Sequence, residues 1–142
     1  MEEVLKNIEK FHGHLGPYVV VGFRMGEIAN KILGKDFFSK KATVFSGINP
    51  PISCIIDGVQ ISSGCTLGKG NINVKNDGLA KTQFSNNNGK KIEIILKSDI
   101  KYEIDTSVTE ENIVDYSKKL FQKSDEELFN IVIWKCLQQI IL

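Results

Sequence analysis

Both histidines of this 142-residue chain lie within three positions, at His12 and His14, with Gly13 between them. Side chains two residues apart on an extended backbone point to the same side, so both imidazole rings can face one point. Neutral imidazole is a common ligand for zinc and for other divalent transition metals. The pair therefore favours a metal site. The alternative is that one histidine ends the first helix and the other is exposed to solvent.

Cys54 and Asp57 form a second candidate pair, because both fall in the first turn of a helix expected after Pro51. Unpaired backbone N–H groups and the helix dipole stabilise a thiolate there, so we expect the pKa of Cys54 to be lowered. A thiolate is both a nucleophile and a metal ligand. Asp57 lies on the same helix face and can serve the same site. The alternative is that Cys54 is a small buried apolar residue and Asp57 a polar residue of the first turn.

The other two cysteines lie further along the chain. Cys65 follows the glycine expected to end the same helix. If that helix is unbroken, Cys65 lies on the order of 16 Å from Cys54. Zinc–sulfur bonds are about 2.3 Å long, so the two thiols then cannot bind one ion. Cys136 falls between apolar residues near the C-terminus and is expected in the core.

The composition is typical of a soluble globular protein, with 42% hydrophobic and 25% charged residues. Residues 1–142 suit a single domain. The formal net charge of +1 gives no electrostatic case for nucleic acid or an anionic membrane as partner, and no apolar run approaches the ~18 residues of a membrane span. The charged N-terminus lacks the apolar segment of a signal peptide, and an odd number of cysteines favours reduced thiols. We therefore expect a cytoplasmic protein.

Helices and one strand are expected to position the candidate residues. Apolar spacing predicts a short helix over about 2–11 and a longer one over 17–33, with the glycine-flanked histidines at their junction. Residues 42–46 are rich in β-branched and aromatic side chains and predict a strand. A third helix is expected over about 52–63, directly after a pair of prolines.

The middle of the chain predicts an antiparallel β-meander. Its turns contain Asp77-Gly78 and Asn88-Gly89, which are strong hairpin signals. The extended segments are residues 70–75, 79–84 and 91–96.

Two helices are expected to close the chain. Thr109 caps the first, and Ser124 with Glu127 forms the capping box of the second, which continues to the C-terminus. Together these elements predict an α+β fold: N-terminal helices, one strand, a central helix, the β-meander and two C-terminal helices.

Four stretches of the chain form a specific combination: Phe11-His12-Gly13-His14-Leu15-Gly16-Pro17, Gly22-Phe23-Arg24-Met25-Gly26, Cys54-Ile55-Ile56-Asp57-Gly58-Val59-Gln60 and Gly64-Cys65-Thr66-Leu67-Gly68-Lys69-Gly70-Asn71. Taken together, they resemble the FmdE family of formylmethanofuran dehydrogenase subunits. The resemblance covers a core of about residues 5–100 and leaves a C-terminal helical part of about 109–142. It implies an α+β fold akin to the catalytic domain of glyceraldehyde-3-phosphate dehydrogenase, in which a cysteine at a helix start is the counterpart of Cys54.

The resemblance also implies a function. Members of this family occur in archaea and anaerobic bacteria, often as metal-binding dimers, and are associated with the molybdenum or tungsten formylmethanofuran dehydrogenase of methanogenic one-carbon metabolism. The family's His-Gly-His segment matches His12 and His14, and its two central cysteines match Cys54 and Cys65. Leu15 and Gly16 stand where many relatives carry a cysteine, and the paired cysteines of a C-terminal zinc ribbon are missing, so a zinc-ribbon role is not carried over.

Three hypotheses follow. The first is a metal-binding accessory protein, expected as a homodimer and as a partner of formylmethanofuran dehydrogenase subunits; zinc suits its mixed imidazole and thiolate ligands, with iron or nickel as alternatives. The second is a metal-free enzyme in which Cys54 is the nucleophile and His12 or His14 its base. The third is a partner-binding subunit whose polar cluster only stabilises a helix junction. The candidate metal ligands are His12, His14, Cys54, Asp57, which can also orient another ligand, and Cys65.

Overall fold

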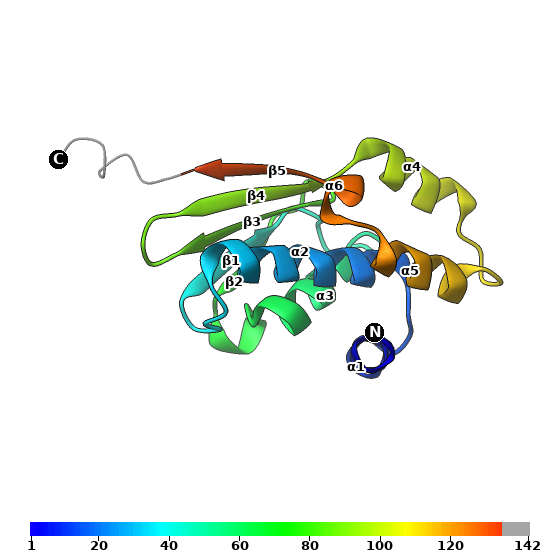
Figure 1. Cartoon of the computed structure of the whole chain (residues 1–142), viewed down its shortest axis with the longest axis horizontal. Helices are drawn as coiled ribbons and strands as arrows, with labels where there is room; N and C mark the ends of the chain where they lie inside the picture. Colours follow the sequence, from blue (N-terminus) through cyan, green and yellow to red (C-terminus); the bar gives the residue numbers. More distant parts are fainter. Residues whose placement is uncertain (135–142) are drawn as a thin grey trace.

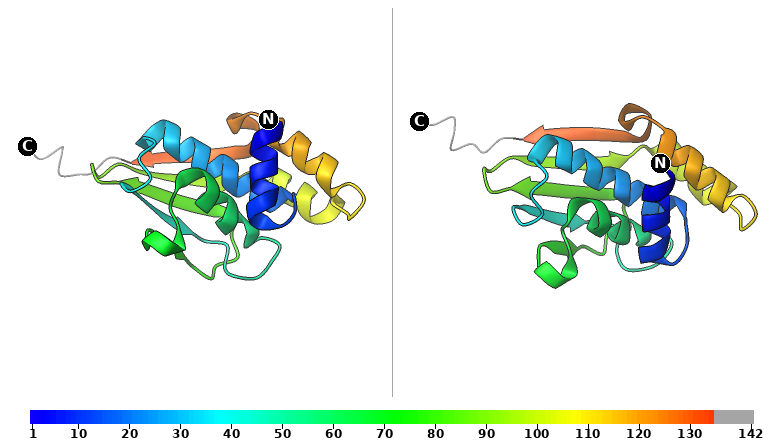
Figure 2. Two further views of the ribbon diagram at one scale, coloured as in Figure 1. Left: turned by 90° about the horizontal axis from the view of Figure 1, so that it is seen from below. Right: turned by 60° about the horizontal axis from the view of Figure 1, so that its bottom comes forward.

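The computed structural model describes residues 1–134; residues 135–142, and with them Cys136, lie outside the described part of the chain. Helices pack on one face of a five-stranded sheet (Figures 1 and 2). The helices are α1 (Glu2–His12), α2 (Pro17–Leu33), α3 (Cys54–Ser63), α4 (Ser98–Ser107), α5 (Ile113–Gln122) and the single turn α6 (Asp125–Leu128), with a short 3-10 helix η1 (Leu67–Lys69). The strands are β1 (Lys40–Val44), β2 (Ile72–Val74), β3 (Lys81–Asn86), β4 (Lys91–Leu96) and β5 (Phe129–Trp134).

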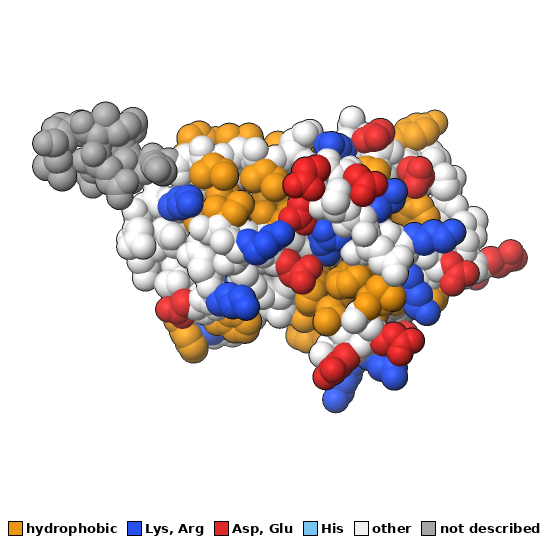
Figure 3. Space-filling model, viewed as in Figure 1, with side chains coloured by type: hydrophobic (Ala, Val, Ile, Leu, Met, Phe, Trp, Pro, Cys, Tyr) orange, Lys and Arg blue, Asp and Glu red, His pale blue; other side chains and the backbone are white. Residues whose placement is uncertain are grey.

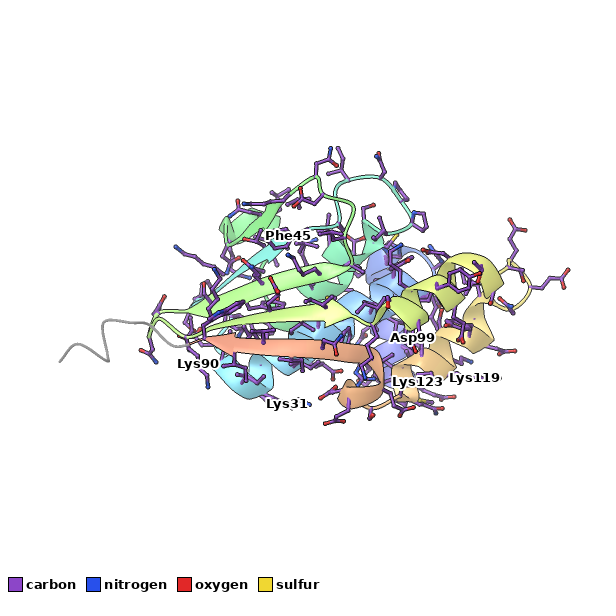
Figure 4. All side chains as sticks on the ribbon, turned by 90° about the horizontal axis from the view of Figure 1, so that it is seen from above. Lys31, Phe45, Lys90, Asp99, Lys119 and Lys123 are labelled. Carbon is purple, nitrogen blue, oxygen red and sulfur yellow. The ribbon has the colours of Figure 1, made fainter. Side chains whose placement is uncertain are left out.

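The sheet has the strand order β2-β1-β3-β4-β5. Strand β2 runs parallel to β1, and the other neighbouring strands are antiparallel. Side chains alternate between the two faces of each strand, and one row across the sheet, Ala42, Phe84 and Ile92, is buried. On the same face the Thr82 hydroxyl donates to Met25 Sδ of α2 at 3.3 Å, so the core lies between this face and α2. Figure 4 shows the opposite face, with the strands in front of α2.

The α+β class is confirmed, and the first half of the chain follows the expected order closely. Helix α1 ends at Gly13, whose φ of 100° lies in the left-handed region that favours glycine. Helix α3 ends in the same way at Gly64. The Asn88-Gly89 turn joins β3 to β4 as an antiparallel hairpin, as predicted. Within residues 1–134, none of the helices combines the length and the apolar character needed to cross a membrane.

The segment after α3 departs from the expected meander. Strand β2 pairs with β1 in parallel, so β1 lies between β2 and β3. The Asp77-Gly78 turn therefore leads from one side of β1 to the other and does not close a hairpin. A turn dipeptide reports the local backbone conformation, and it carries no information on which strand the chain pairs with next.

The expected C-terminal helix is wrong over residues 129–134, and the rest of that prediction lies outside the described residues. The capping box is present, since Ser124 Oγ accepts from the Glu127 N–H and Glu127 Oε1 accepts from the Ser124 N–H, both at 3.1 Å. Helix α6 nevertheless ends at Leu128, and the chain continues as β5, which pairs antiparallel with β4. Residues 129–134 are mostly β-branched or aromatic and favour a strand, and pairing with the open edge of β4 outweighs their helical spacing.

Helix α4 was not expected from the sequence, and α5 begins later than predicted, with Asn112 rather than Thr109 at its N-cap. A tyrosine of α2 ties α4 to the rest of the fold. The buried Tyr18 hydroxyl donates to Asp105 of α4. Burial and this carboxylate raise the pKa of Tyr18, so its hydroxyl stays a hydrogen-bond donor.

Candidate functional site

Three of the five candidate ligands line one open cavity of about 290 Å³. The cavity lies where the end of α1 meets the start of α3. Figure 2 shows α1 beside the first turns of α3. The loop before α3 supplies the rest of the wall. The lining residues are His12, Ile48, Pro50, Ser53, Cys54, Ile56 and Asp57.

His12 and Asp57 are joined directly. His12 Nδ1 lies 2.6 Å from Asp57 Oδ2, and the two side chains are 10% and 37% exposed. An ionised carboxylate only accepts hydrogen bonds, so Nδ1 carries the hydrogen and donates it to Asp57. This leaves Nε2 of a neutral ring as the nitrogen with a lone pair. Asp57 therefore fixes both the tautomer and the orientation of His12.

Cys54 shares this cavity, but its electrostatic setting is the reverse of the expectation. Burial raises the pKa of the half-buried Cys54 thiol, and the negative charge of Asp57 raises it further. A backbone hydrogen bond lowers the pKa by less. The first N–H groups of α3 also have carbonyl partners in the preceding turn: Cys54 N–H donates to the Pro51 carbonyl at 3.1 Å and Ile55 N–H to the Ile52 carbonyl at 3.2 Å.

His14 lies next to this cavity without lining it. Its ring centroid is 5.0 Å from that of His12, and the two rings are tilted by 42°. The residue is exposed, and its ring lies against Gly16: a Cβ added at Gly16 would be 3.0 Å from His14 Cε1. The His-Gly-His segment thus brings the two rings together, as expected, although only His12 faces the candidate site.

Cys65 lies apart from the other candidates. Helix α3 is unbroken, so about 15 Å of helix separate its ends. Cys65 is fully buried just beyond the far end, where its backbone N–H donates to Ser63 Oγ at 3.1 Å. Burial raises the pKa of its thiol. The structure therefore places Cys65 in a different part of the molecule from Cys54.

Residues 1–134 of one chain do not by themselves assemble a complete metal site. Across residues 1–134, no three His, Cys, Asp or Glu side chains converge in a geometry that holds a metal ion. With Asp57 Oδ2 engaged with His12, the cavity offers Nε2 of His12 as its nitrogen donor and the thiol of Cys54 as its sulfur donor. Zinc takes at least three protein ligands, so any ion here needs a further ligand.

Sequence reasoning missed the loop residues that form the remaining wall. Ile48 is 73% exposed at the cavity, and Pro50 and Ser53 continue the wall toward α3. The signal was the proline pair at Pro50 and Pro51, which forces the chain to turn immediately before the helix that carries Cys54.

Comparisons with known proteins agree with this architecture. A protein from Archaeoglobus fulgidus, described as a probable S-adenosyl-L-methionine-binding protein, is 33% identical over 135 residues. The match covers 94% of this chain and 33% of that protein, so the chain spans about a third of the length of its curated relative.

A solved structure shows the same fold. The crystal structure of a tungsten formylmethanofuran dehydrogenase FmdE-like protein from Syntrophus aciditrophicus aligns with a TM-score of 0.68 at 19% identity, covering 99% of this chain and 75% of the other. The model of the FmdE family, described as "Molybdenum formylmethanofuran dehydrogenase operon", matches residues 11–130. That match includes the His-Gly-His segment, all of α3 and the sheet up to the start of β5. By this match, the chain belongs to the FmdE family.

Proposed function

We propose that this chain is a metal-binding accessory protein of a formylmethanofuran dehydrogenase system, and that it binds zinc or a similar divalent ion at the His12–Cys54 cavity. Membership of the FmdE family supports a role associated with formylmethanofuran dehydrogenase. The observation that carries the metal proposal is the hydrogen bond from His12 to Asp57.

A histidine that binds a metal commonly donates its other ring N–H to a carboxylate, which orients the ring and makes it a stronger ligand. His12 has this arrangement already, with Asp57 on Nδ1 and Nε2 available. Cys54 supplies a thiolate, since a coordinating thiol is deprotonated even where burial otherwise favours the neutral form. Imidazole and thiolate together suit zinc, which acts as a Lewis acid when it keeps an open position.

The missing ligand is the second part of the proposal. His14 is exposed beside His12, so rotation of its side chain is one source of a third donor. A second copy of the chain or another formylmethanofuran dehydrogenase component is the other source. Ile48, which lines the cavity, is 73% exposed, and Phe11, the chain neighbour of His12, is 58% exposed. A partner docked at this surface would cover such apolar side chains. We place this assembly in the cytoplasm, where thiols stay reduced.

Elemental analysis of untagged protein, purified without chelators, tests the proposal. We expect near-stoichiometric metal in the unaltered chain and none in folded His12→Ala or Cys54→Ala variants. Asp57→Asn should weaken metal affinity about 10-fold to 100-fold, because a neutral amide replaces the charged acceptor that orients His12. Cys65→Ala is the matched control and should keep the metal. Protein that neither carries metal nor takes up zinc would contradict the proposal, and His14→Ala shows whether His14 is the third ligand.

The same geometry supports a second candidate, a cysteine-dependent enzyme. A carboxylate that orients a histidine beside a thiol is the arrangement used to activate nucleophiles. The raised pKa of Cys54 opposes it, because a nucleophilic thiol needs a lowered one.

The rate of alkylation by iodoacetamide separates the two candidates. In metal-free protein we expect Cys54 to react more slowly at pH 7 than a small-molecule thiol, with a rate that rises only above the usual thiol pKa. Asp57→Asn should speed this reaction by removing the neighbouring negative charge. Rapid, selective alkylation at pH 7 that depends on His12 would instead favour the enzyme.

A further inference from the structure

A second and more spacious cavity lies among the helices, away from the His12 site. It has a volume of about 720 Å³, within the range of about 300–1,000 Å³ typical of small-molecule sites. Residues from α1, α2, α3, α5 and α6 and from the segments after α2 and α5 line it, and none of them lines the His12 cavity. Figure 3 shows apolar side chains gathered on this side of the molecule between α2 and α1, with charged side chains around them.

One wall of this cavity is apolar and partly aromatic. It combines Val4, Phe23, Ile61 and Phe121, each from a different helix and each only partly buried. The rings of Phe23 and Phe121 lie 6.1 Å apart and are tilted by 48°. Such surfaces bind flat apolar groups, because aromatic rings pack on each other in offset or tilted arrangements.

The other wall is charged and carries an excess of positive charge. Four cations, Arg24, Lys31, Lys35 and Lys123, face two carboxylates. Arg24 and Lys31 are paired with Asp125. By contrast, no carboxylate of the described residues lies within 4.0 Å of Lys35, an exposed residue, and the carboxylate nearest to Lys123 is 3.9 Å away. Figure 4 shows Lys31 and Lys123 along the same edge of the molecule. The excess charge therefore suits an anionic group.

Asn30 contributes a polar side chain to the lining. Its Nδ2 donates to the Ser62 carbonyl at 2.9 Å, which ties α2 to α3 beside the cavity.

From these features we infer that the cavity binds a small aromatic anion: a flat ring that carries a phosphate, carboxylate or sulfonate group. The ring packs on Phe23 and Phe121, and the anionic group lies toward Lys35 and Lys123. This binding site is independent of the proposed metal, since the two cavities share no residue.

The fluorescent dye 1-anilinonaphthalene-8-sulfonate is a suitable probe, because it has aromatic rings and a sulfonate. We expect saturable binding to the native full chain. Lys35→Glu should raise the dissociation constant about twofold to fivefold, the effect of an exposed charge pair. Lys41→Glu makes the same charge change at an exposed position of β1 outside the cavity and should leave binding unchanged.

Filling the cavity provides a second test. Ile61→Trp should abolish dye binding while circular dichroism shows a folded chain. Adenosine 5′-monophosphate and benzoate then serve as phosphate and carboxylate competitors, and displacement by either one supports the inference and identifies the anion. The inference would be overturned by unsaturable binding, by equal effects of Lys35→Glu and Lys41→Glu, or by failure of both competitors to displace the dye.

Discussion

Replacing Gly58 with alanine is expected to destabilise the protein by about 3 kcal/mol or more, the upper part of the range for overpacking a core. Gly58 lies in α3 where that helix crosses α2. A Cβ at this position would be 2.1 Å from the Val19 carbonyl oxygen and 2.4 Å from the Phe23 backbone nitrogen. Both obstructing atoms belong to the α2 backbone, so no side-chain rotation relieves the clash.

The sign of this prediction depends on which of two effects is larger. Alanine favours a helix over glycine by about 1 kcal/mol, so Gly58→Ala in an open helix would stabilise. The clash with α2 exceeds this gain, because the two helix backbones would have to move apart along the crossing. Helix α2 has no room for a side chain at the crossing either, since a Cβ at Gly22 would be 2.1 Å from the Ile55 carbonyl oxygen of α3.

Thermal unfolding measures this effect, and Gly68→Ala is the matched control. Nothing lies within 4 Å of a Cβ at Gly68, so that variant should stay within about 0.5 kcal/mol of the unaltered protein. Gly58→Ala should lower the melting temperature by roughly 10 °C. Equal melting temperatures for the two variants would show that α2 and α3 do not cross as closely as the structure has them.

This crossing illustrates what sequence reasoning can and cannot provide. Helix α3 was expected from its flanking prolines and glycine, which are local signals. The sequence showed only that Gly22 and Gly58 lie inside helices. Their close approach to each other's helix depends on tertiary packing, which no local pattern predicts. The misassigned β5 has the same cause: residues 129–134 fit both a helical and an extended pattern, and pairing with β4 decided between them.

The sequence predicted the residues of the candidate site better than it predicted the contacts between them. Residue chemistry pointed to His12, Cys54 and Asp57, and the structure brings all three to one cavity. The direct contact of His12 with Asp57 joins residues 45 positions apart, so it cannot be predicted from the local spacing of residues in the sequence. The pKa of Cys54 was predicted in the wrong direction, because burial and a neighbouring charge depend on tertiary packing. For the same reason the second cavity, built from five helices, had no sequence signal.

Arg24 joins α2 to the end of α5. Replacing it with methionine is expected to lower the free energy of unfolding by about 3–5 kcal/mol, as for removal of one member of a buried ion pair. The guanidinium is buried and donates to the carbonyls of Phe121 and Lys123, at 2.7 and 2.6 Å. Those carbonyls belong to the end of α5, where no helical N–H follows to satisfy them. A third bond, 2.8 Å long, joins Arg24 to Asp125. Methionine fills much of the volume but leaves these acceptors without donors.

The cost of Arg24→Met should depend on pH, because burial raises the pKa of Asp125 by less than its bonds with Lys31 and Arg24 lower it. A carboxyl group whose pKa is lowered by folding contributes stability above its unfolded pKa of about 3.9, and this is lost as the pH falls through the folded value. Urea unfolding at pH 7 and pH 3 should therefore show a smaller difference between Arg24→Met and the unaltered chain in acid. Lys31→Met is the control: it removes an exposed partner of the same carboxylate and should cost less than about 1 kcal/mol at pH 7. If both variants lower the free energy of unfolding by the same amount, burial of Arg24 is not what makes its hydrogen bonds strong.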